Sequence, residues 1–271
     1  MYREQTNKMK LPSVKAASKN GVAFGLIASQ IIIAAVLWMF CPIAALPKPP
    51  EIFSAWLDLV NNNAMINQLC ISIIVNVQSI ILSLVITLSL TYLSMLPKGI
   101  GNFCNPVVNL ISKFRFFSLT GFIFLFTILF GIGHGLKVSL LTFGLTVFYL
   151  TSTLSIVNEI PKEEFDHART LRYNEWEVIW EVVVLGRLDY VCEALRQNAA
   201  MGWVMLTMVE GLSRGEGGIG KLLLDENKHF RLEQIFAIQI TILIIGFMQD
   251  KIINLIKKTC FRYSELGKVN R

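Results

Sequence analysis

The feature that most constrains this 271-residue chain is a set of apolar runs longer than the helices of most water-soluble domains. The clearest run extends from Cys70 to Leu96 and contains no Asp, Glu, Lys or Arg. About 20 apolar helical residues are enough to cross the hydrocarbon core of a bilayer, which is about 30 Å thick. Only 16% of the residues are charged, whereas soluble domains average about 25%. The sequence therefore predicts an all-α membrane protein.

The apolar runs predict about six transmembrane helices. A glycine-rich turn at 131–135 divides one long run in two, because glycine supplies the backbone freedom that a tight reversal needs. This gives a cytoplasmic tail over 1–20, a transmembrane domain over 21–256 with a polar loop at about 158–197, and a second tail over 257–271. The expected spans are Gly21–Leu46, Cys70–Leu96, two within about 113–157, a short one at Asn198–Leu212, and a last one from Ile235 toward Ile256.

The distribution of Lys and Arg predicts the orientation, because cytoplasmic loops of membrane proteins retain positive charge. Of the 25 basic residues, 19 fall within 1–20, 97–115, 158–197 and 250–271. With six spans, these segments share one side with both termini. We therefore expect a multi-pass membrane protein with both ends in the cytoplasm. The basic N-terminus followed by a long apolar run is interpreted as a retained anchor rather than a cleaved signal.

Several functional classes are not expected. The net charge of +6 is explained by contact with anionic lipid headgroups, so no nucleic-acid partner is predicted. The five cysteines are scattered without ligand spacing, so we expect no metal site and no cofactor. No catalytic residues are predicted. The chain also lacks a phosphate-binding G-x-x-x-x-G-K-[ST] motif, so any ATP hydrolysis would belong to another polypeptide.

The most informative polar segment is the loop from about Asn158 to Gln197. Apolar residues recur in it near helical spacing between charged ones, which predicts amphipathic helix. Pro161 suits a first helical turn, and the acids after it suit the positive end of the helix dipole. A folded helical hairpin is therefore expected. Two interpretations remain open: a helix lying on lipid headgroups, or a docking element for a soluble partner.

The order of motifs resembles importer permeases of the sulfonate, taurine and nitrate type, over roughly residues 40 to 260. Their common order and spacing carry the resemblance, since each is weak alone. They are Leu46-Pro47-Lys48-Pro49, Phe130-Gly131-Ile132-Gly133, Asp166-His167-Ala168-Arg169-Thr170-Leu171, Trp176, Val182-Val183, Leu188, Tyr190, Ala194-Leu195-Arg196, Trp203, Glu210 and Gly217-Gly218-Ile219-Gly220.

The resemblance implies the type I ABC importer permease fold and a coupling helix, the EAA motif, that rests on a separate ATPase. The motif diverges here: Asp166 and His167 replace its Glu and first Ala, and Arg172 replaces its glycine. Because Arg permits a sharp change of direction less readily than Gly, a more continuous helix than usual is expected. The residues implied in ATPase coupling are Glu164, Phe165, Asp166, His167, Ala168, Arg169, Leu171, Arg172 and Trp176.

Three polar residues within expected spans are pathway or gate candidates: Asn76, Gln78 and Glu210. An acidic side chain within the membrane is unfavourable unless it is paired or hydrated. Glu210 is therefore interpreted in one of two ways: as a gate residue that faces Arg214 or a neighbouring helix, or as a residue at the membrane interface. Asn76 and Gln78 either contact solute or form interhelical hydrogen bonds. Outside the spans, the segment Glu51–Asn62 is expected to form a short helix along the outer surface.

The functional expectation is a permease subunit that forms a solute pathway by alternating access. The resemblance implies three protein partners: an ABC ATPase, a periplasmic or extracellular solute-binding protein, and a second permease subunit that forms a homodimer with this chain. Membrane lipid is the other expected partner. The resemblance also implies a location in the bacterial inner (plasma) membrane. A small polar or anionic solute is only a family-level expectation. The alternatives are a secondary transporter driven by an ion gradient, and a noncatalytic divergent permease paralogue.

The charge distribution generates a topology prediction. A reporter fused after Asn174 should be cytoplasmic and one fused after Asn227 external, because the Lys and Arg count places those loops on opposite sides. Paired alkaline phosphatase and fluorescent-protein fusions measure this. Finding both positions on one side would exclude the six-span arrangement.

Overall fold

The computed structural model describes residues 46–61, 64–96, 100–213 and 215–261, together with isolated positions between 26 and 39. The expected first span Gly21–Leu46 therefore lies largely outside the described residues. The chain divides into two units, 1–51 and 52–271, and the fold reported below is that of the second. Within the described ranges the regular structure is entirely helical.

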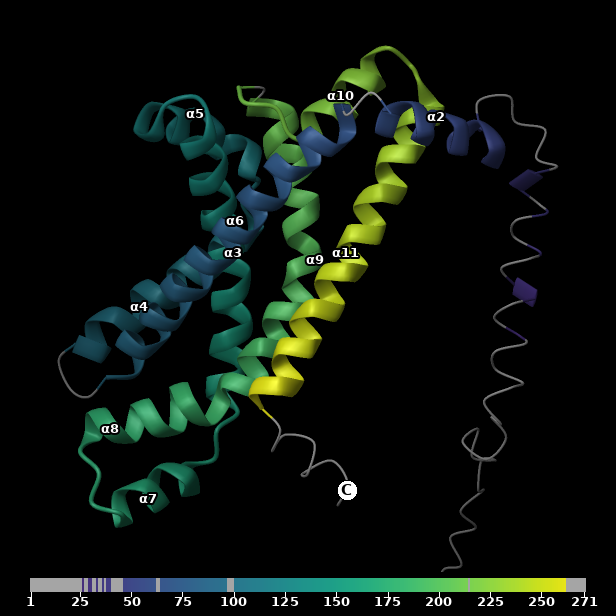
Figure 1. Cartoon of the computed structure of the whole chain (residues 1–271). Coiled ribbons are helices and arrows are strands. Elements are labelled where there is room, and N and C mark those ends of the chain that lie inside the picture. The colour runs from purple at the N-terminus through teal and green to yellow at the C-terminus, as the bar shows by residue number, and fades with distance from the viewer. Residues whose placement is uncertain are drawn as a thin grey trace, which may run out of the picture. The chain divides into compact units, whose positions relative to one another are not determined.

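Three described helices are long and apolar enough to cross a membrane: α3 (Ala64–Met95), α6 (His134–Asn158) and α11 (Leu232–Cys260). Helix α9 (Leu188–Ser213) lies between α6 and α11 and contains the expected short span, but it does not reach the same apolarity. In the most apolar window of α6, 67% of the residues are buried, against 11% for α11. Helix α6 is therefore the central helix, and α11 is peripheral (Figure 1).

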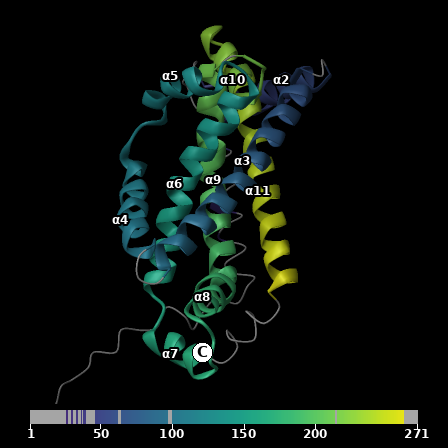
Figure 2. The same cartoon turned by 90° about the vertical axis from the view of Figure 1, so that its left-hand side faces the viewer.

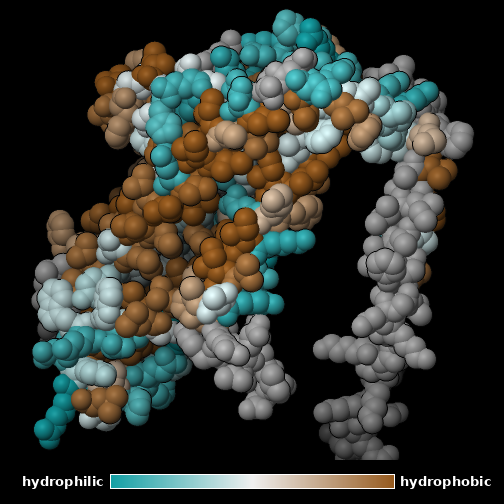
Figure 3. Space-filling model, viewed as in Figure 1, coloured by the Kyte–Doolittle hydropathy of each residue, from teal (hydrophilic) through white to brown (hydrophobic). Residues whose placement is uncertain are grey.

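The core lies where α3, α6 and α9 meet. Leu141, Leu145 and Tyr149 of α6 pack against Val75 of α3 and against Trp203 of α9. Figures 1 and 2 show α3 crossing α6 and α9 obliquely. The outer surface of the long helices forms an apolar band between hydrophilic ends (Figure 3). An apolar band of this kind suits a lipid environment, because bilayer hydrocarbon replaces water around it.

The segment expected as a cytoplasmic loop at 97–115 is different in the structure. Residues 100–113 form helix α4 (Ile100–Lys113), which packs against α3 and α6 and continues through the turn η2 (Phe114–Phe116) into α5 (Leu119–Phe130). The two helices bend by 117° as a broken span or re-entrant pair. Clustered rings fix the bend, since Phe114, Phe122 and Phe126 pack on Phe143 of α6 with centroids 5.1 to 6.4 Å apart.

The short helix expected at Glu51–Asn62 is confirmed as α2 (Pro49–Asn61). Proline suits its first turn because the missing N–H would have no intrahelical partner there. Ile52, Ala55 and Leu59 form its buried face. Trp56 Nε1 donates to Thr241 Oγ1 of α11 at 3.1 Å, which orients the helix on the start of α11.

The two polar segments lie at opposite ends of the long helices. Helices α7 (Lys162–Thr170) and α8 (Glu175–Ile179), which is followed by the π-helical turn η3 (Trp180–Val184) and the 3₁₀ turn η4 (Leu185–Arg187), lie at one end. Helix α10 (Ile219–Lys228) lies at the other end (Figures 1 and 2). This arrangement agrees with the expectation that the loops 158–197 and 214–231 face opposite sides.

Candidate functional sites: a charged hairpin and a buried polar junction

The expected helical hairpin is present, and we call residues 162–187 the hairpin. It is not the continuous helix expected from the replacement of glycine by Arg172. Arg172 instead adopts φ 62°, in the left-handed region, and reverses the chain between α7 and α8. A non-glycine residue in that region is strained by about 1–2 kcal/mol. Other contacts must therefore hold the turn.

Arg169 clasps this turn from the end of α7. Its Nε and Nη2 donate to the two carboxylate oxygens of Glu175 at 3.1 and 3.2 Å, and its Nη1 donates to Asp166 at 3.2 Å. The hydrogen bonds to Glu175, and then those to Asp166, raise the pKa of Arg169 further above its ordinary value, so the clasp stays charged. A bidentate ion pair fixes the relative orientation of its two partners as well as their distance. The pair therefore holds the first turn of α8 against the last turn of α7.

Two further contacts stabilise the fold of the hairpin. Arg187 Nη2 donates to Glu164 Oε1 at 2.6 Å, which ties η4 back to α7. At the start of α8, the Glu177 carboxylate accepts the backbone N–H of Asn174 at 2.8 Å in a capping box. The hairpin is thus linked at its tip and at its base.

The apolar residues of the hairpin separate into an inner and an outer set. Phe165 and the buried Ile179 and Val183 pack with Leu96 and Val157, at the ends of α3 and α6. Phe165 is therefore half-buried in its own chain rather than free for a partner. Leu171 and Trp176 are 58% and 48% exposed. The other residues implied in coupling are exposed except the buried Ala168: Glu164, Asp166, His167, Arg169 and Arg172.

At the opposite end, Glu210 is the centre of a buried polar junction. Its side chain is fully buried. Ser72 Oγ of α3 lies 2.7 and 2.8 Å from the two carboxylate oxygens, and the backbone N–H of Gly220 donates to one of them at 2.9 Å. Glu210 is thus enclosed by protein and holds the turn before α10. Arg214, its suggested partner, lies outside the described residues.

The turn at 217–220 is bound by α3 and α6 as well as by Glu210 of α9. The backbone N–H of Ile219 donates to Ser72 Oγ at 2.8 Å, and that of Gly218 donates to Gln68 Oε1. Lys137 of α6, which is fully buried, donates to the Gly217 carbonyl at 2.5 Å. Sequence reasoning did not select Lys137, although a lysine in the first turn of an apolar helix is itself a signal that a buried partner exists.

The glycines of this turn are required by geometry. Gly217 and Gly218 have φ of 83° and 113°, which side chains other than glycine rarely adopt. A Cβ on Gly218 would collide with the Glu210 carboxylate, and one on Gly220 would collide with the backbone of Thr207. The motif therefore needs glycine at 218 because the backbone passes directly over a buried acid, and at 220 because two backbones approach closely.

The other two pathway candidates lie in different environments. Asn76 is buried and donates to Gln249 Oε1 of α11 at 3.0 Å, so it forms an interhelical hydrogen bond. Gln78 is exposed, and its Oε1 lies 2.7 Å from His134 Nε2. Gln78 and His134 border an open apolar groove of about 1100 Å³ between α3, α4, α5 and α6. Thr142 and Thr146 also line it, and the described residues offer their hydroxyls no partner.

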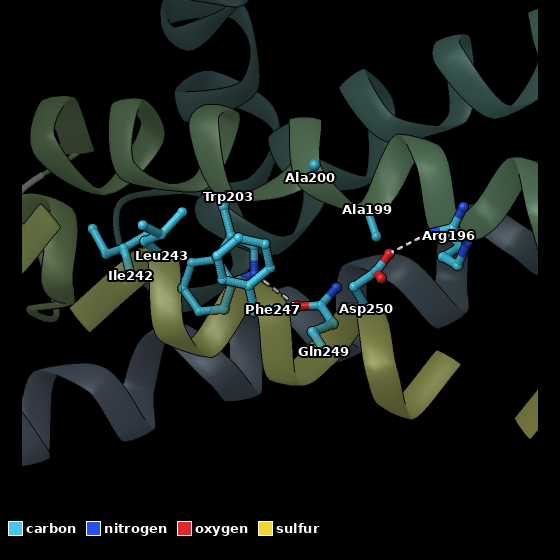
Figure 4. A pocket seen from close by; sticks show the side chains of 10 residues that line it. Arg196, Ala199, Ala200, Trp203, Ile242, Leu243, Phe247, Gln249 and Asp250 are labelled. Carbon is cyan, nitrogen blue, oxygen red and sulfur yellow. Dashed lines mark hydrogen bonds and ion pairs between the residues drawn. The ribbon is translucent and has the colours of Figure 1, made fainter. Parts of the chain in front are cut away.

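A second cavity, of about 390 Å³, lies between α9 and α11, where small residues such as Ala199, Ala200 and Gly246 leave room. Figure 4 shows Trp203 and Gln249 pointing toward one another within it, joined by a 2.7 Å hydrogen bond. At one end Arg196 pairs with Asp250 at 2.8 Å. The cavity is therefore crossed by polar contacts that link the two helices.

No known family model matches the chain. Over 139 residues it is 24% identical to a Methanocaldococcus jannaschii protein named as an ABC transporter permease, an overlap of 51% of this chain and 52% of that protein. The chain thus spans about half the length of this curated relative. Its structure also matches a chain from inward-facing conformations of the MetNI methionine ABC transporter. The TM-score is 0.61 at 16% sequence identity, over 72% of this chain and 94% of the other.

The chain has the fold of a type I ABC importer permease. The expected all-α membrane fold is thereby confirmed. In this permease fold the hairpin is the polar connection between α6 and α9, and the junction fixes the turn between α9 and α10. The junction joins residues far apart in the sequence, since Ser72 and Glu210 are separated by 138 positions. The hairpin is braced more locally, and the longest of its bracing hydrogen bonds spans 23 positions.

The junction predicts a selective loss of stability. Gly218→Ala should lower the thermal unfolding midpoint in detergent, because the new Cβ adds backbone strain of about 1–3 kcal/mol and displaces the Glu210 carboxylate. Gly121→Ala is the matched control: it lies within α5, and a Cβ there would meet nothing within 4 Å. Its midpoint should be unchanged or raised. Equal midpoints for the two variants would contradict the assignment.

Proposed function

We propose that this chain is the membrane-spanning permease subunit of an ATP-driven, binding-protein-dependent importer. The observation that carries the proposal is the type I permease fold with a braced, charged hairpin at one end of its long helices. The similarity over 139 residues to a protein named as an ABC transporter permease supports it independently. ATP hydrolysis is assigned to a separate ATPase subunit.

We assign coupling to the hairpin. Its braced tip exposes Leu171 and Trp176, and large exposed apolar groups on a polar loop favour a protein partner. Glu164, Asp166 and Arg169 form a polar rim around them. Through Phe165, the hairpin rests on the cluster at the ends of α3 and α6. Movement of the tip would therefore displace α3 and α6 together. Alternating access requires a coupled movement of this kind.

The solute pathway is assigned to the groove bordered by Gln78, His134 and Thr142, closed by a second copy of this chain in a homodimer. A periplasmic or extracellular solute-binding protein would deliver the solute. The sulfonate, taurine and nitrate resemblance favours a small polar or anionic solute. Within the described groove lining, the hydroxyl, amide and imidazole groups are the hydrogen-bonding side chains.

The cellular setting follows from the same proposal. The chain would lie in the bacterial inner membrane with both termini in the cytoplasm, which places the hairpin on the side where ATP is available. The apolar band of the long helices would face lipid or the second subunit.

The coupling assignment predicts that Leu171→Ala weakens association with the cognate ATPase. Truncating an anchor at an interface centre often costs about 2 kcal/mol or more, so at least a tenfold loss is expected. Leu212→Ala is the matched control, because Leu212 is 49% exposed at the opposite end of α9. The measurement is ATPase retained on copurification, together with ATP-driven uptake in proteoliposomes. Equal retention and uptake by both variants would refute the docking role.

A further inference from the structure

A small cavity of about 350 Å³ lies beside the hairpin, and we call it the aromatic pocket. It is separate from the exposed Leu171 at the tip. Two of its rings, Tyr92 from the end of α3 and Trp180 from η3, meet edge to face with centroids 5.7 Å apart. The lining consists of Tyr92, Tyr173, Trp176, Glu177, Trp180 and Glu181.

Helical spacing explains how one segment supplies most of this pocket. Tyr173 lies in the turn before α8, and Trp176 of α8 and Trp180 of η3 are four residues apart, so the two indoles lie near one another on the helix surface. Ile179 and Val183 of the same segment are buried against the ends of α3 and α6. The three rings are instead 42% to 48% exposed, so they form the outward side of the segment.

The charge of the lining selects the kind of occupant. No basic side chain lines the pocket, and two carboxylates do. The Glu177 carboxylate already accepts the Asn174 N–H. Among the described residues, the Glu181 carboxylate has no hydrogen-bond or ion-pair partner. Aromatic faces attract cations, and a nearby carboxylate adds direct charge pairing. Rings with an unpaired acid fit an organic cation, either a guanidinium or an ammonium group.

The wider charge pattern favours a protein as the source of that cation. Residues 159–190 contain eight acidic and four basic residues, within a chain whose net charge is +6. Anionic headgroups would repel this segment while they attract the rest of the chain. An acidic, aromatic surface of this kind is complementary to a basic patch on a soluble protein.

We propose that the aromatic pocket receives a basic side chain, Arg or Lys, from the cytoplasmic partner of the permease. The identity of that partner rests on the proposed function, whereas the cation preference rests on the pocket alone. The inserted cation lies against the ring faces and pairs with Glu181. It gives the partner a second attachment point on α8 and η3, beside the tip.

The first experiment tests the cation preference on the full chain in nanodiscs. N-acetylarginine amide is titrated against tryptophan fluorescence, with the neutral isostere N-acetylcitrulline amide as the ligand control. Saturable binding of the arginine compound is expected, with a Kd on the order of 1 mM, and none of the citrulline compound. Trp176→Phe should remove the signal. Equal response to both compounds, or to neither, overturns the proposal.

A matched pair of variants locates the binding. Glu181→Gln should weaken binding of the arginine compound by about tenfold. Glu163→Gln, which removes the same charge from the exposed side of α7, should leave it unchanged. Equal weakening in the two variants would mean that only the net charge matters, and would overturn the assignment to the pocket.

The second experiment identifies the source of the cation by copurification with the cognate ATPase. Glu181→Gln should reduce retention and its salt dependence, while Glu163→Gln retains ATPase like the wild type. If wild type and Glu181→Gln retain ATPase equally, the partner assignment fails and the permease proposal stands. That result together with arginine binding would make the pocket a receptor for free amines. If the wild type retains no ATPase, both proposals fail.

Discussion

The fold depends on satisfying a carboxylate that the protein buries away from water. Glu210 is fully buried, and an acid in that position is tolerated only when protein groups supply its hydrogen bonds. Ser72 and the Gly220 N–H supply them, and Ser72 at the same time accepts from Ile219. One side chain thus sets the relative positions of α3, α9 and the start of α10. Gly218 follows from this contact, because the backbone there passes directly over the carboxylate.

The opposite end of the same helices is built on another principle. The tip of the hairpin is exposed, so the turn there depends on mutual bracing of charged side chains. The Arg169 clasp on Glu175 holds the strained turn at Arg172, and Arg187 holds Glu164. Helices α3 and α6 reach from the junction to the Phe165 cluster. The hairpin and the junction are therefore joined by two helices, and hydrogen bonds fix the far ends of these helices.

Polar side chains also join α11, which is mostly unburied, to the other helices. Gln249 accepts from Asn76 of α3 and from Trp203 of α9. Arg196 pairs with Asp250, and Lys257 with Glu193 at 2.7 Å. Lipid tails are as apolar as leucine, so apolar side chains alone give little preference for contact between helices in a membrane. The hydrogen bonds and ion pairs between α11 and its neighbours therefore determine which helices α11 packs against.

The sequence by itself determined the membrane class, the long helices, the glycine division before α6, the helix α2 and a helical hairpin after Pro161. These features depend on local hydropathy, helical period and turn chemistry, which are readable within a short window. The permease fold was indicated by the order of motifs.

Only the tertiary structure decided which polar and aromatic groups meet. It placed a left-handed residue at Arg172, helix α4 within an expected loop and Phe165 inside its own chain. It also showed that Glu210 is the centre of a junction. The physical reason is that these outcomes are set by side-chain contacts between elements, where a clasp or a buried hydrogen bond can outweigh a local preference.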